Sequence, residues 1–482
     1  MPGNNFFLTT PIYYVNDVPH IGHAYTTVAA DVLARWKRSR GLDAKLLTGT
    51  DEHGAKIEEA AAQAGETPKV YADEIASAFR AEWDRLGIQP DRFIRTTDAD
   101  HEETVRQFLQ KMFDAGVITR GIYEGLYCVG HEKFMSPDEL VGGKCPDHGK
   151  VPEPYKEENY FFKLSKFADE LIRRIESDEI EVRPLERKNE VLGKLRQGLQ
   201  DISISRAKLS WGIPLPFDSS HTAYVWVDAL INYYTYGKPK GLWPADLHLI
   251  GKDILWFHSI IWPAMLLAIG EAPPRKIFAH GFFTIGGKKM SKTLGNVITP
   301  AELVKKYGVD GARYLVLSAF PFGTDGDFDW ARLTEKYNAD LANGIGNLHA
   351  RLTRLAESSV GIVLGWDDEL SEVRKFRDKY DAALEKLDFY QALQVIRELI
   401  SKGDKLVNEK KPWALAGEAQ KNELQKLLNI LFAIAHFANP FMPETSGKIL
   451  GSLGIAEINE FKKIGKAVLE VRKIENLFPR ME

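Results

Sequence analysis

Two imidazoles and two ammonium groups occur in short segments that could together bind a triphosphate. One segment reads VPHIGH and contains His20 and His23, and the other reads KKMSKT and contains Lys289 and Lys292. The imidazoles could donate hydrogen bonds to phosphate oxygens, and the lysines could hold a departing pyrophosphate. Because an enzyme that activates a substrate with ATP needs both groups, we expect the fold to bring these distant segments together.

The residues around the first segment predict a strand-to-helix turn. FFLTT at 6–10 is short, β-branched and aromatic, which is typical of a strand. The run after His23 predicts a helix that ends before Gly41, because its apolar residues have helical spacing. These apolar residues are Val28, Val32, Leu33 and Trp36. A helix N-terminus presents N–H groups to phosphate, and Gly22 allows close approach of a nucleotide. Read alone, each segment could instead be a solvated surface turn or loop.

Together the two segments match the HIGH and KMSKS signatures of class I aminoacyl-tRNA synthetases. The last serine of the second signature is Thr293 here, which keeps the hydroxyl group. Further segments resemble the methionyl-tRNA synthetases within that class, in the same order along nearly the whole chain. These segments read TTPIYYVNDVPHIGHAYTT, TGTDEHG, YVWVDALINY, GKDILWFHSIIWPAML and LANGIGNL.

This resemblance implies a methionine–tRNA ligase that uses methionine, ATP and tRNA(Met), with Mg²⁺ sharing the phosphate charge. Methionine would become methionyl-adenylate and then pass to the terminal adenosine, where class I membership implies the 2′-hydroxyl. Two other classes remain open: a nucleotidyltransferase that adenylates a small metabolite, and an inactive RNA-binding relative. The helical last third of the chain argues against the first class, and the intact histidines and lysines argue against the second.

The resemblance also assigns further residues to the ATP site. Gly251, Lys252 and Asp253 join Gly22, the two signature histidines and the two signature lysines. Asp253 follows a predicted strand and could accept a hydrogen bond from a ribose hydroxyl. Arg206, in the segment SISRA, resembles a family arginine near the reacting groups, although a surface arginine is the alternative.

A methionine pocket needs an apolar, polarisable slot for the thioether and an anion for the ammonium group. Aromatic rings suit the sulfur, at ~0.3–1.5 kcal/mol for each contact. The resemblance assigns the anion to Asp51. It places around the slot Ile12, Tyr14, Trp226, Ala229, Leu230, Tyr233, Ile254 and His258. Without the family, Trp226 and Tyr233 could be core residues and Asp51 a helix cap.

Two C-x2-H pairs, Cys128 with His131 and Cys145 with His148, could hold a tetrahedral Zn²⁺. Four protein ligands leave no open position, so the metal would be structural. The surrounding segment is glycine-rich and polar and has little core of its own, so a metal would help to fold it. The family usually has more cysteines in this place, and His131 stands where cysteine is common. Ordinary thiols and loop histidines are the alternative.

The chain is too long for one ordinary core and predicts an α/β protein with an all-α end. Strand and helix signals alternate over residues 1–116 and again over 211–280. This alternation predicts a Rossmann-like parallel-sheet catalytic domain, whose ligands bind at the carboxyl ends of the strands. Residues 117–210, which contain the metal knuckles, would be an insertion between the two halves.

The rest of the chain predicts a connecting module and a helical domain. Residues 281–345 contain the KMSKT loop and then two expected helices separated by Gly308. This whole segment would form a module that contacts the tRNA stem. Residues 346–482 have helical periodicity and predict an anticodon-binding bundle.

The bundle would read unpaired bases by stacking on rings and by hydrogen bonds to base edges. Arg397, Asp404, Asn408 and Trp413 recur at helical spacing on one segment. Asn408 and Trp413 are the candidates for base contacts, although Trp413 could instead anchor the core. The family's late tryptophan has no obvious counterpart, and Phe461 would take its place.

Composition limits the class of protein and its compartment. The apolar content of 44% and the charged content of 27% are those of a globular protein. A net charge of −4 excludes a wholly basic nucleic-acid coat but allows a local basic surface. We expect no secretory signal and no membrane span, and two cysteines fit a reducing cytoplasm. Because no appended barrel follows the bundle, we expect a monomer.

Overall fold

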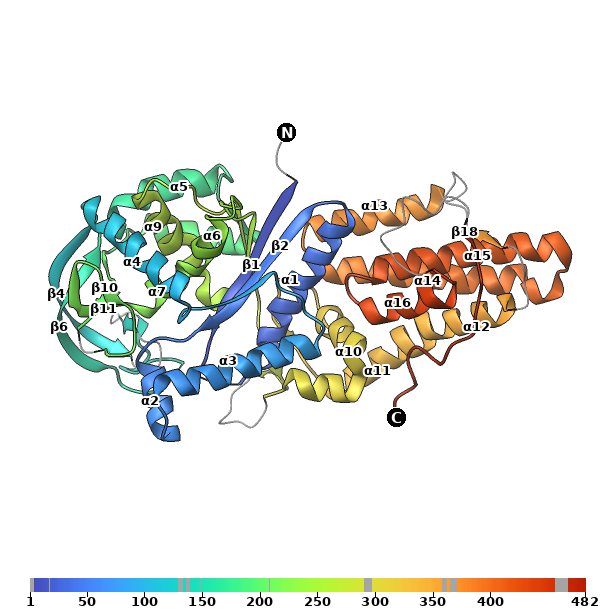
Figure 1. Cartoon of the computed structure of the whole chain (residues 1–482), viewed down its shortest axis with the longest axis horizontal. Helices are drawn as coiled ribbons and strands as arrows, with labels where there is room; N and C mark the ends of the chain where they lie inside the picture. The colour runs from blue at the N-terminus through green and yellow to red at the C-terminus, as the bar shows by residue number, and fades with distance from the viewer. Residues whose placement is uncertain are drawn as a thin grey trace. The chain divides into compact units, whose positions relative to one another are not determined.

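The computed structural model describes residues 4–16, 18–128, 133–135, 139–147, 149–207, 209–289, 297–357, 362–364, 371–455 and 467–482 (Figure 1). The chain divides into two compact units. The first unit contains Met1–Val18, Lys45–Ala81 and Pro90–Ala279. The second unit contains Pro19–Ala44, Glu82–Gln89 and His280–Glu482.

A six-stranded sheet with the order β3-β2-β1-β12-β13-β7 lies mostly within the first unit. Its strands are β1 (Asn5–Tyr14), β2 (Asp43–Asp51), β3 (Arg92–Arg95), β7 (Glu181–Arg183), β12 (Leu247–Gly251) and β13 (Lys276–His280). β1 runs parallel to β12, β2 to β3 and β13 to β7, in agreement with the predicted parallel sheet. The strand order reverses between β1 and β12, and open α/β sheets bind ligands at such a point.

Helices follow the strands of this sheet, as the alternating pattern predicts. They are α2 (Ala55–Ala64), α3 (Pro68–Arg85), α4 (Ala99–Asp114), α5 (Ala168–Glu176), α6 (Leu185–Arg196), α7 (Val225–Leu230), α8 (Asn232–Gly237) and α9 (Trp262–Ala268). Asp98 occupies the N-cap position of α4. Its carboxylate accepts a hydrogen bond from the Arg95 backbone at 3.0 Å.

A long antiparallel ribbon occupies most of the segment between the two halves of the sheet (Figure 1). Its strands are β4 (Ile118–Cys128), β5 (Lys133–Met135), β6 (Glu153–Phe162) and β8 (Ile202–Ser203). The edge strand β7 of the parallel sheet also comes from this segment. A smaller sheet follows, with the strands β9 (Ser205–Arg206), β10 (Pro214–Leu215) and β11 (Asp218–Ala223).

In the second unit, α1 (Ile21–Ser39) begins directly after His20, which is its N-cap residue. Lys37 and Arg38 lie in its last turn, where cations complement the helix dipole. Gly41 follows with a φ of 85°, a left-handed conformation that favours glycine. The predicted strand-to-helix turn around the first signature is therefore confirmed.

The segment after the second signature folds as predicted. α10 (Pro300–Ser318) starts with a capping box between Thr299 and Glu302 and is broken at Gly308, whose φ is 72°. Around it lie β14 (Phe283–Ile285), β15 (Lys288–Lys289), β16 (Gly326–Asp327) and α11 (Trp330–Lys336).

The end of the chain is a helical bundle, in agreement with the predicted all-α domain. Its helices are α12 (Asn347–Ala356), α13 (Ser371–Glu385), α14 (Phe389–Lys410), α15 (Gly417–Ala438) and α16 (Pro443–Ser452). α14 packs on α13 and α15, and α15 on α16 (Figure 1). The last periodic run divides into two helices because Pro440 and Pro443 cannot continue α15. A short pair of strands, β17 (Val363–Leu364) and β18 (Ala467–Val468), ties the terminal segment to the bundle.

Two π-helical segments, Phe257–Ile261 and Tyr337–Gly346, were not predicted from the apolar periodicity. Both lie in segments that carry the family resemblance, and π-turns are frequent at functional sites. Among the helices in the described ranges, none is both long enough and apolar enough to cross a bilayer.

Candidate functional site

The two signature histidines form the cap of α1. The backbone N–H of Gly22 donates to His20 Nδ1 at 3.1 Å, and the backbone N–H of His20 donates to His23 Nδ1 at 3.3 Å. The two rings stack with their centroids 3.8 Å apart. The arrangement is a capping box in which imidazole nitrogens replace the usual hydroxyl and carboxylate oxygens.

This cap determines the tautomer of both rings. Each Nδ1 accepts a backbone hydrogen bond, so it carries no proton, and in the neutral ring the proton lies on Nε2. Burial, together with the neighbouring His20, lowers the pKa of His23 well below its usual value and keeps that ring neutral. In each neutral imidazole the N–H group is therefore at Nε2.

Both flanks of the second signature attach to the helix that carries the first. The Ile21 N–H donates to the carbonyl of Ile298, just after the loop, at 2.9 Å. Before the loop, His280 Nε2 lies 2.6 Å from Thr26 Oγ1, and Phe283 meets Tyr25 edge-on at 4.6 Å between ring centroids. The two signatures thus converge within one compact unit.

The structure describes only one of the two signature lysines. Lys289 is the last residue of β15, which pairs with β14. Lys292 lies outside the described residues, and its predicted role stays a prediction. The three remaining ATP candidates belong to the first unit: Gly251 ends β12, and Lys252 and Asp253 begin the 3₁₀ turn that follows. They occupy the carboxyl end of a central strand, as the sequence predicts.

A hydrogen-bonded tyrosine and histidine lie among the methionine candidates. His258 Nδ1 lies 3.0 Å from the Ile254 carbonyl and donates to it, and His258 Nε2 accepts from the Tyr233 hydroxyl at 2.7 Å. Burial lowers the pKa of His258 to about 4, so the ring is neutral. Burial also raises the pKa of Tyr233, and the nearby Asp51 carboxylate adds to the rise.

The other methionine candidates lie in or against the apolar core of the first unit. The Trp226 ring stacks on Phe257, with centroids 3.9 Å apart and planes 9° from parallel. The sequence did not single out Phe257. Four further candidates pack in or against the core there, namely Ile12, Tyr14, Ala229 and Leu230. The alternative that Asp51 caps a helix is wrong, because Asp51 ends β2 and Gly54 occupies the N-cap position of α2.

Arg206 is half-buried and held in place by its neighbours. Its guanidinium donates to Ser203 Oγ at 3.2 Å and to the Ser205 carbonyl at 2.7 Å. It also lies over the Tyr224 ring, 4.4 Å from the centroid. Such a guanidinium is oriented in advance for an anionic ligand.

The two cysteines lie together in a small buried apolar cluster. The backbone N–H of Cys145 donates to the Lys150 carbonyl at 2.9 Å, which closes a tight turn after this cysteine. His131 and His148 lie outside the described residues. Within the described part of the chain, no three metal-ligating side chains converge. Two buried thiols, one of them on a tight turn, are suitable ligands for a shared zinc ion. The zinc site itself stays a prediction.

The anticodon candidates differ in how their side chains are held. Asn408 Oδ1 and Asp404 Oδ1 accept from the same guanidinium, that of Arg351, at 2.7 and 3.0 Å. Trp413 is 53% exposed, so the alternative that it anchors the core is wrong. Phe461 lies outside the described residues. Arg397, the fourth polar residue at this spacing, pairs with Asp340 at 3.1 Å.

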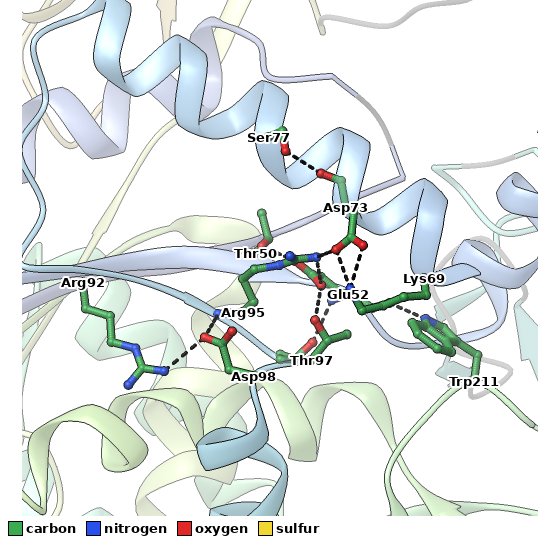
Figure 2. A network of polar contacts seen from close by, with 11 residues as sticks. Thr50, Glu52, Lys69, Asp73, Ser77, Arg92, Arg95, Thr97, Asp98 and Trp211 are labelled. Atoms are coloured by element: carbon green, nitrogen blue, oxygen red, sulfur yellow. Dashed lines mark hydrogen bonds and ion pairs between the residues drawn. The ribbon is translucent and has the colours of Figure 1, made fainter. Parts of the chain in front are cut away.

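Sequence reasoning missed the polar groups that hold the TDEHG segment. Glu52 is fully buried, and its carboxylate accepts from Arg95 at 2.6 and 2.8 Å and from Thr97 at 2.6 Å (Figure 2). Arg95 also donates to Asp73 of α3. The indole N–H of Trp211 donates to the Glu52 carbonyl. A charged run next to Asp51 was the only signal in the sequence, and it does not reveal which distant residues pair with it.

The parallel sheet with its reversed strand order, the HIGH turn that caps a helix and the KMSKT loop anchored beside it define a class I aminoacyl-tRNA synthetase. Residues 6–151 and 147–353 match the family described as tRNA synthetases class I (M). Residues 367–477 match the anticodon binding domain of methionyl tRNA ligase. The chain belongs to the methionyl-tRNA synthetase family.

Relatives of known name cover nearly the whole chain. The methionine–tRNA ligase of Caldanaerobacter subterraneus subsp. tengcongensis is 43% identical over an alignment of 503 positions, which covers 99% of this chain and 79% of the relative. That of Thermotoga maritima is 45% identical over 94% of this chain and 76% of its own length. The Mycobacterium tuberculosis methionyl-tRNA synthetase in complex with methionyl-adenylate has a TM-score of 0.92 and 35% identity, and covers 99% of this chain and 100% of its own.

Proposed function

We propose that the chain is a methionine–tRNA ligase that activates L-methionine with ATP and transfers it to the terminal adenosine of tRNA(Met). The observation that carries this proposal is the convergence of the two signatures. Ile21 of the HIGH turn is hydrogen-bonded to Ile298, which follows the KMSKT loop. A single triphosphate could therefore meet imidazoles on one side and ammonium groups on the other.

In the first step, the methionine carboxylate would attack the α-phosphate, and the bond to the pyrophosphate oxygen would break. Asp51 would pair with the ammonium group while the slot around Trp226 and Tyr233 holds the thioether. The Nε2–H groups of His20 and His23 would donate to phosphate oxygens as charge develops in the transition state. No covalent enzyme intermediate is needed, because positioning and electrostatics supply the rate.

The remaining candidates would hold the nucleotide and its leaving group. Lys289 and Lys292 would neutralise the departing pyrophosphate, and Arg206 would face the reacting groups. The turn after β12 would hold the adenosine, with Asp253 accepting from a ribose hydroxyl. Mg²⁺, which enters with ATP, would share the phosphate charge.

In the second step, the 2′-hydroxyl of the terminal adenosine would attack the adenylate carbonyl and release AMP. The bundle would select tRNA(Met) through its anticodon. The exposed Trp413 ring suits base stacking, and Asn408 is held at a fixed position by Arg351. Phe461 is the third candidate for this surface.

The ribbon segment would carry a structural zinc ion. Cys128 and Cys145 would supply thiolates from the buried cluster they share, and His131 and His148 would complete the set. Zinc in such a closed site would supply folding energy to the small apolar cluster that the two cysteines share with Met135. We further propose a cytoplasmic monomer, which sedimentation of the purified full chain would test.

The decisive experiment measures ATP–pyrophosphate exchange with each of the twenty amino acids and then aminoacylation of tRNA. We expect methionine alone to support both reactions. The Asp51→Asn variant should raise KM for methionine about 10–100-fold, because a charge-assisted contact is lost. Methionine-dependent exchange without aminoacylation would favour a nucleotidyltransferase. Absence of exchange with any amino acid would favour an inactive RNA-binding protein.

A further inference from the structure

A buried carboxylate lies between two imidazoles in the first unit. Asp228 is 1% exposed; its Oδ2 lies 2.7 Å from His53 Nδ1 and its Oδ1 lies 2.8 Å from His101 Nε2. His101 is fully buried, and its Nδ1 lies 3.0 Å from Thr235 Oγ1. Because an ionised carboxylate can only accept, both histidines must present N–H groups to Asp228.

These three residues join the segments that carry the methionine candidates. His53 follows Asp51 by two residues at the end of β2, and Asp228 lies between Trp226 and Ala229 on α7. Glu52, between Asp51 and His53, is anchored by Arg95 (Figure 2). The backbone that presents the Asp51 carboxylate is therefore held by two attachments, and the one through His53 leads directly to α7.

We propose that Asp228 is a positioning residue that, through His53, sets the position of the Asp51 carboxylate relative to the apolar slot on α7, and thereby the length of amino acid accepted. This inference rests on the proposed function. A methionine-sized ligand must reach the carboxylate with its ammonium group and the slot with its thioether. A shift of α7 relative to β2 would change the distance between the Asp51 carboxylate and the slot. A 1 Å misplacement can cost ~100-fold in rate.

The charges of the group support a geometric role. Burial alone would lower the pKa of His53, but the charge and hydrogen bond of Asp228 outweigh it, and Glu102 and Glu52 add to the net rise. Burial alone would raise the pKa of Asp228, but the two histidines outweigh it and lower the pKa. A buried carboxylate–imidazole pair contributes little net stability compared with apolar packing, whereas its directional hydrogen bonds restrict geometry.

The test compares variants of the full chain in ATP–pyrophosphate exchange with methionine, ethionine and homocysteine, which differ by one methylene or methyl group. For the isosteric Asp228→Asn, we expect KM for methionine to rise at least ~10-fold, KM for ATP to change less than ~2-fold, and the preference for methionine over ethionine to fall. His53→Leu should behave similarly. His53→Asn places an amide N–H where Nδ1 lay, so it should restore most of the wild-type KM.

His349→Leu is the matched control. His349 is 1% exposed and its Nε2 lies 2.9 Å from Ser452 Oγ in the bundle, so the substitution also removes a buried imidazole contact. It should lower stability without changing KM for methionine or the preference for methionine. Wild-type kinetics in folded Asp228→Asn and His53→Leu, or an equal shift in the control, would overturn the inference. If Asp228→Asn does not fold, the two His53 variants decide alone. Failure of the wild-type protein to exchange with methionine would instead refute the proposed function.

Discussion

The residue that best shows how local geometry prepares chemistry is His23. Its Nδ1 accepts from the His20 backbone, so only Nε2 can donate outward. A hydroxyl cap would stabilise the helix as well but would leave no donor that reaches a phosphate. The same side chain therefore stabilises the N-terminus of α1 and, under the proposed function, would determine which atom meets the nucleotide.

One substitution should separate the capping role of His23 from its proposed role in catalysis. In His23→Asn, the amide oxygen can replace Nδ1 as acceptor, but the side chain is too short to reach a phosphate. We expect the free energy of unfolding to stay within ~0.5 kcal/mol of wild type, while pyrophosphate exchange falls about 100–1,000-fold, as for loss of one transition-state donor. Urea unfolding and exchange assays measure the two quantities. Exchange within a few-fold of wild type would show that Nε2 does not act on ATP.

At the scale of elements, the break in α10 depends on a backbone conformation that only glycine adopts easily. Gly308 has a φ of +72° and no atom within 4 Å of the position that a Cβ would take. The strain of a substitution is therefore in the backbone and not in packing. Gly308→Ala should lower the free energy of unfolding by about 1–2 kcal/mol.

A second glycine provides the control for α10. Gly447 lies within α16, where the φ is ordinary and the space for a Cβ is also open. Gly447→Ala should be neutral or stabilising by up to ~1 kcal/mol, because alanine is the better helix former. Urea unfolding of both variants checks the pair, and equal effects at the two positions would contradict the explanation for Gly308.

The two cysteines of the ribbon segment lead to a testable prediction about zinc binding. If Cys128 and Cys145 bind zinc, Cys128→Ser should lose the bound metal and expose residues 128–151 to protease, since the small apolar cluster that the two cysteines form with Met135 is the local core there. Chelation of the wild-type protein should give the same digestion pattern. Metal analysis together with limited proteolysis measures both effects. A wild-type protein without stoichiometric zinc, or a serine variant that retains it, would refute the site.

At the scale of the whole molecule, buried neutral histidines should make the protein sensitive to acid. Burial lowers the pKa of His258, His280 and His349 to about 4, of His436 to about 3, and of His23 and His248 well below the usual value. In the unfolded chain these rings bind protons near pH 6.5. Below that pH the unfolded state binds more protons, so the free energy of unfolding falls as the pH falls.

Urea unfolding between about pH 7.5 and pH 5 measures this dependence. The midpoint should fall steadily below about pH 6.5, and His349→Leu should reduce the slope by removing one such ring. His53 acts in the opposite direction, because its raised pKa contributes stability that is lost as the pH rises through that value. A midpoint that is constant or rises on acidification would show that the buried histidines do not dominate.

The sequence predicted this molecule well where a signal is local. The strand before His20, the helix after it and the break at Gly308 follow from residue type and spacing, which act over a few residues. Family resemblance also indicated the methionine candidates, among which the side chains of Tyr233 and His258 are hydrogen-bonded to each other in the structure.

The sequence by itself determined the class of the protein, its parallel sheet and its helical end, because periodicity and signature motifs are written in consecutive residues. Only the tertiary structure decided that Asp228 lies between His53 and His101, that Glu52 pairs with Arg95, and that Trp413 is exposed. Burial and the choice of a distant polar partner depend on how separate elements pack. The residues next to a position in the sequence do not specify its burial or its distant partner.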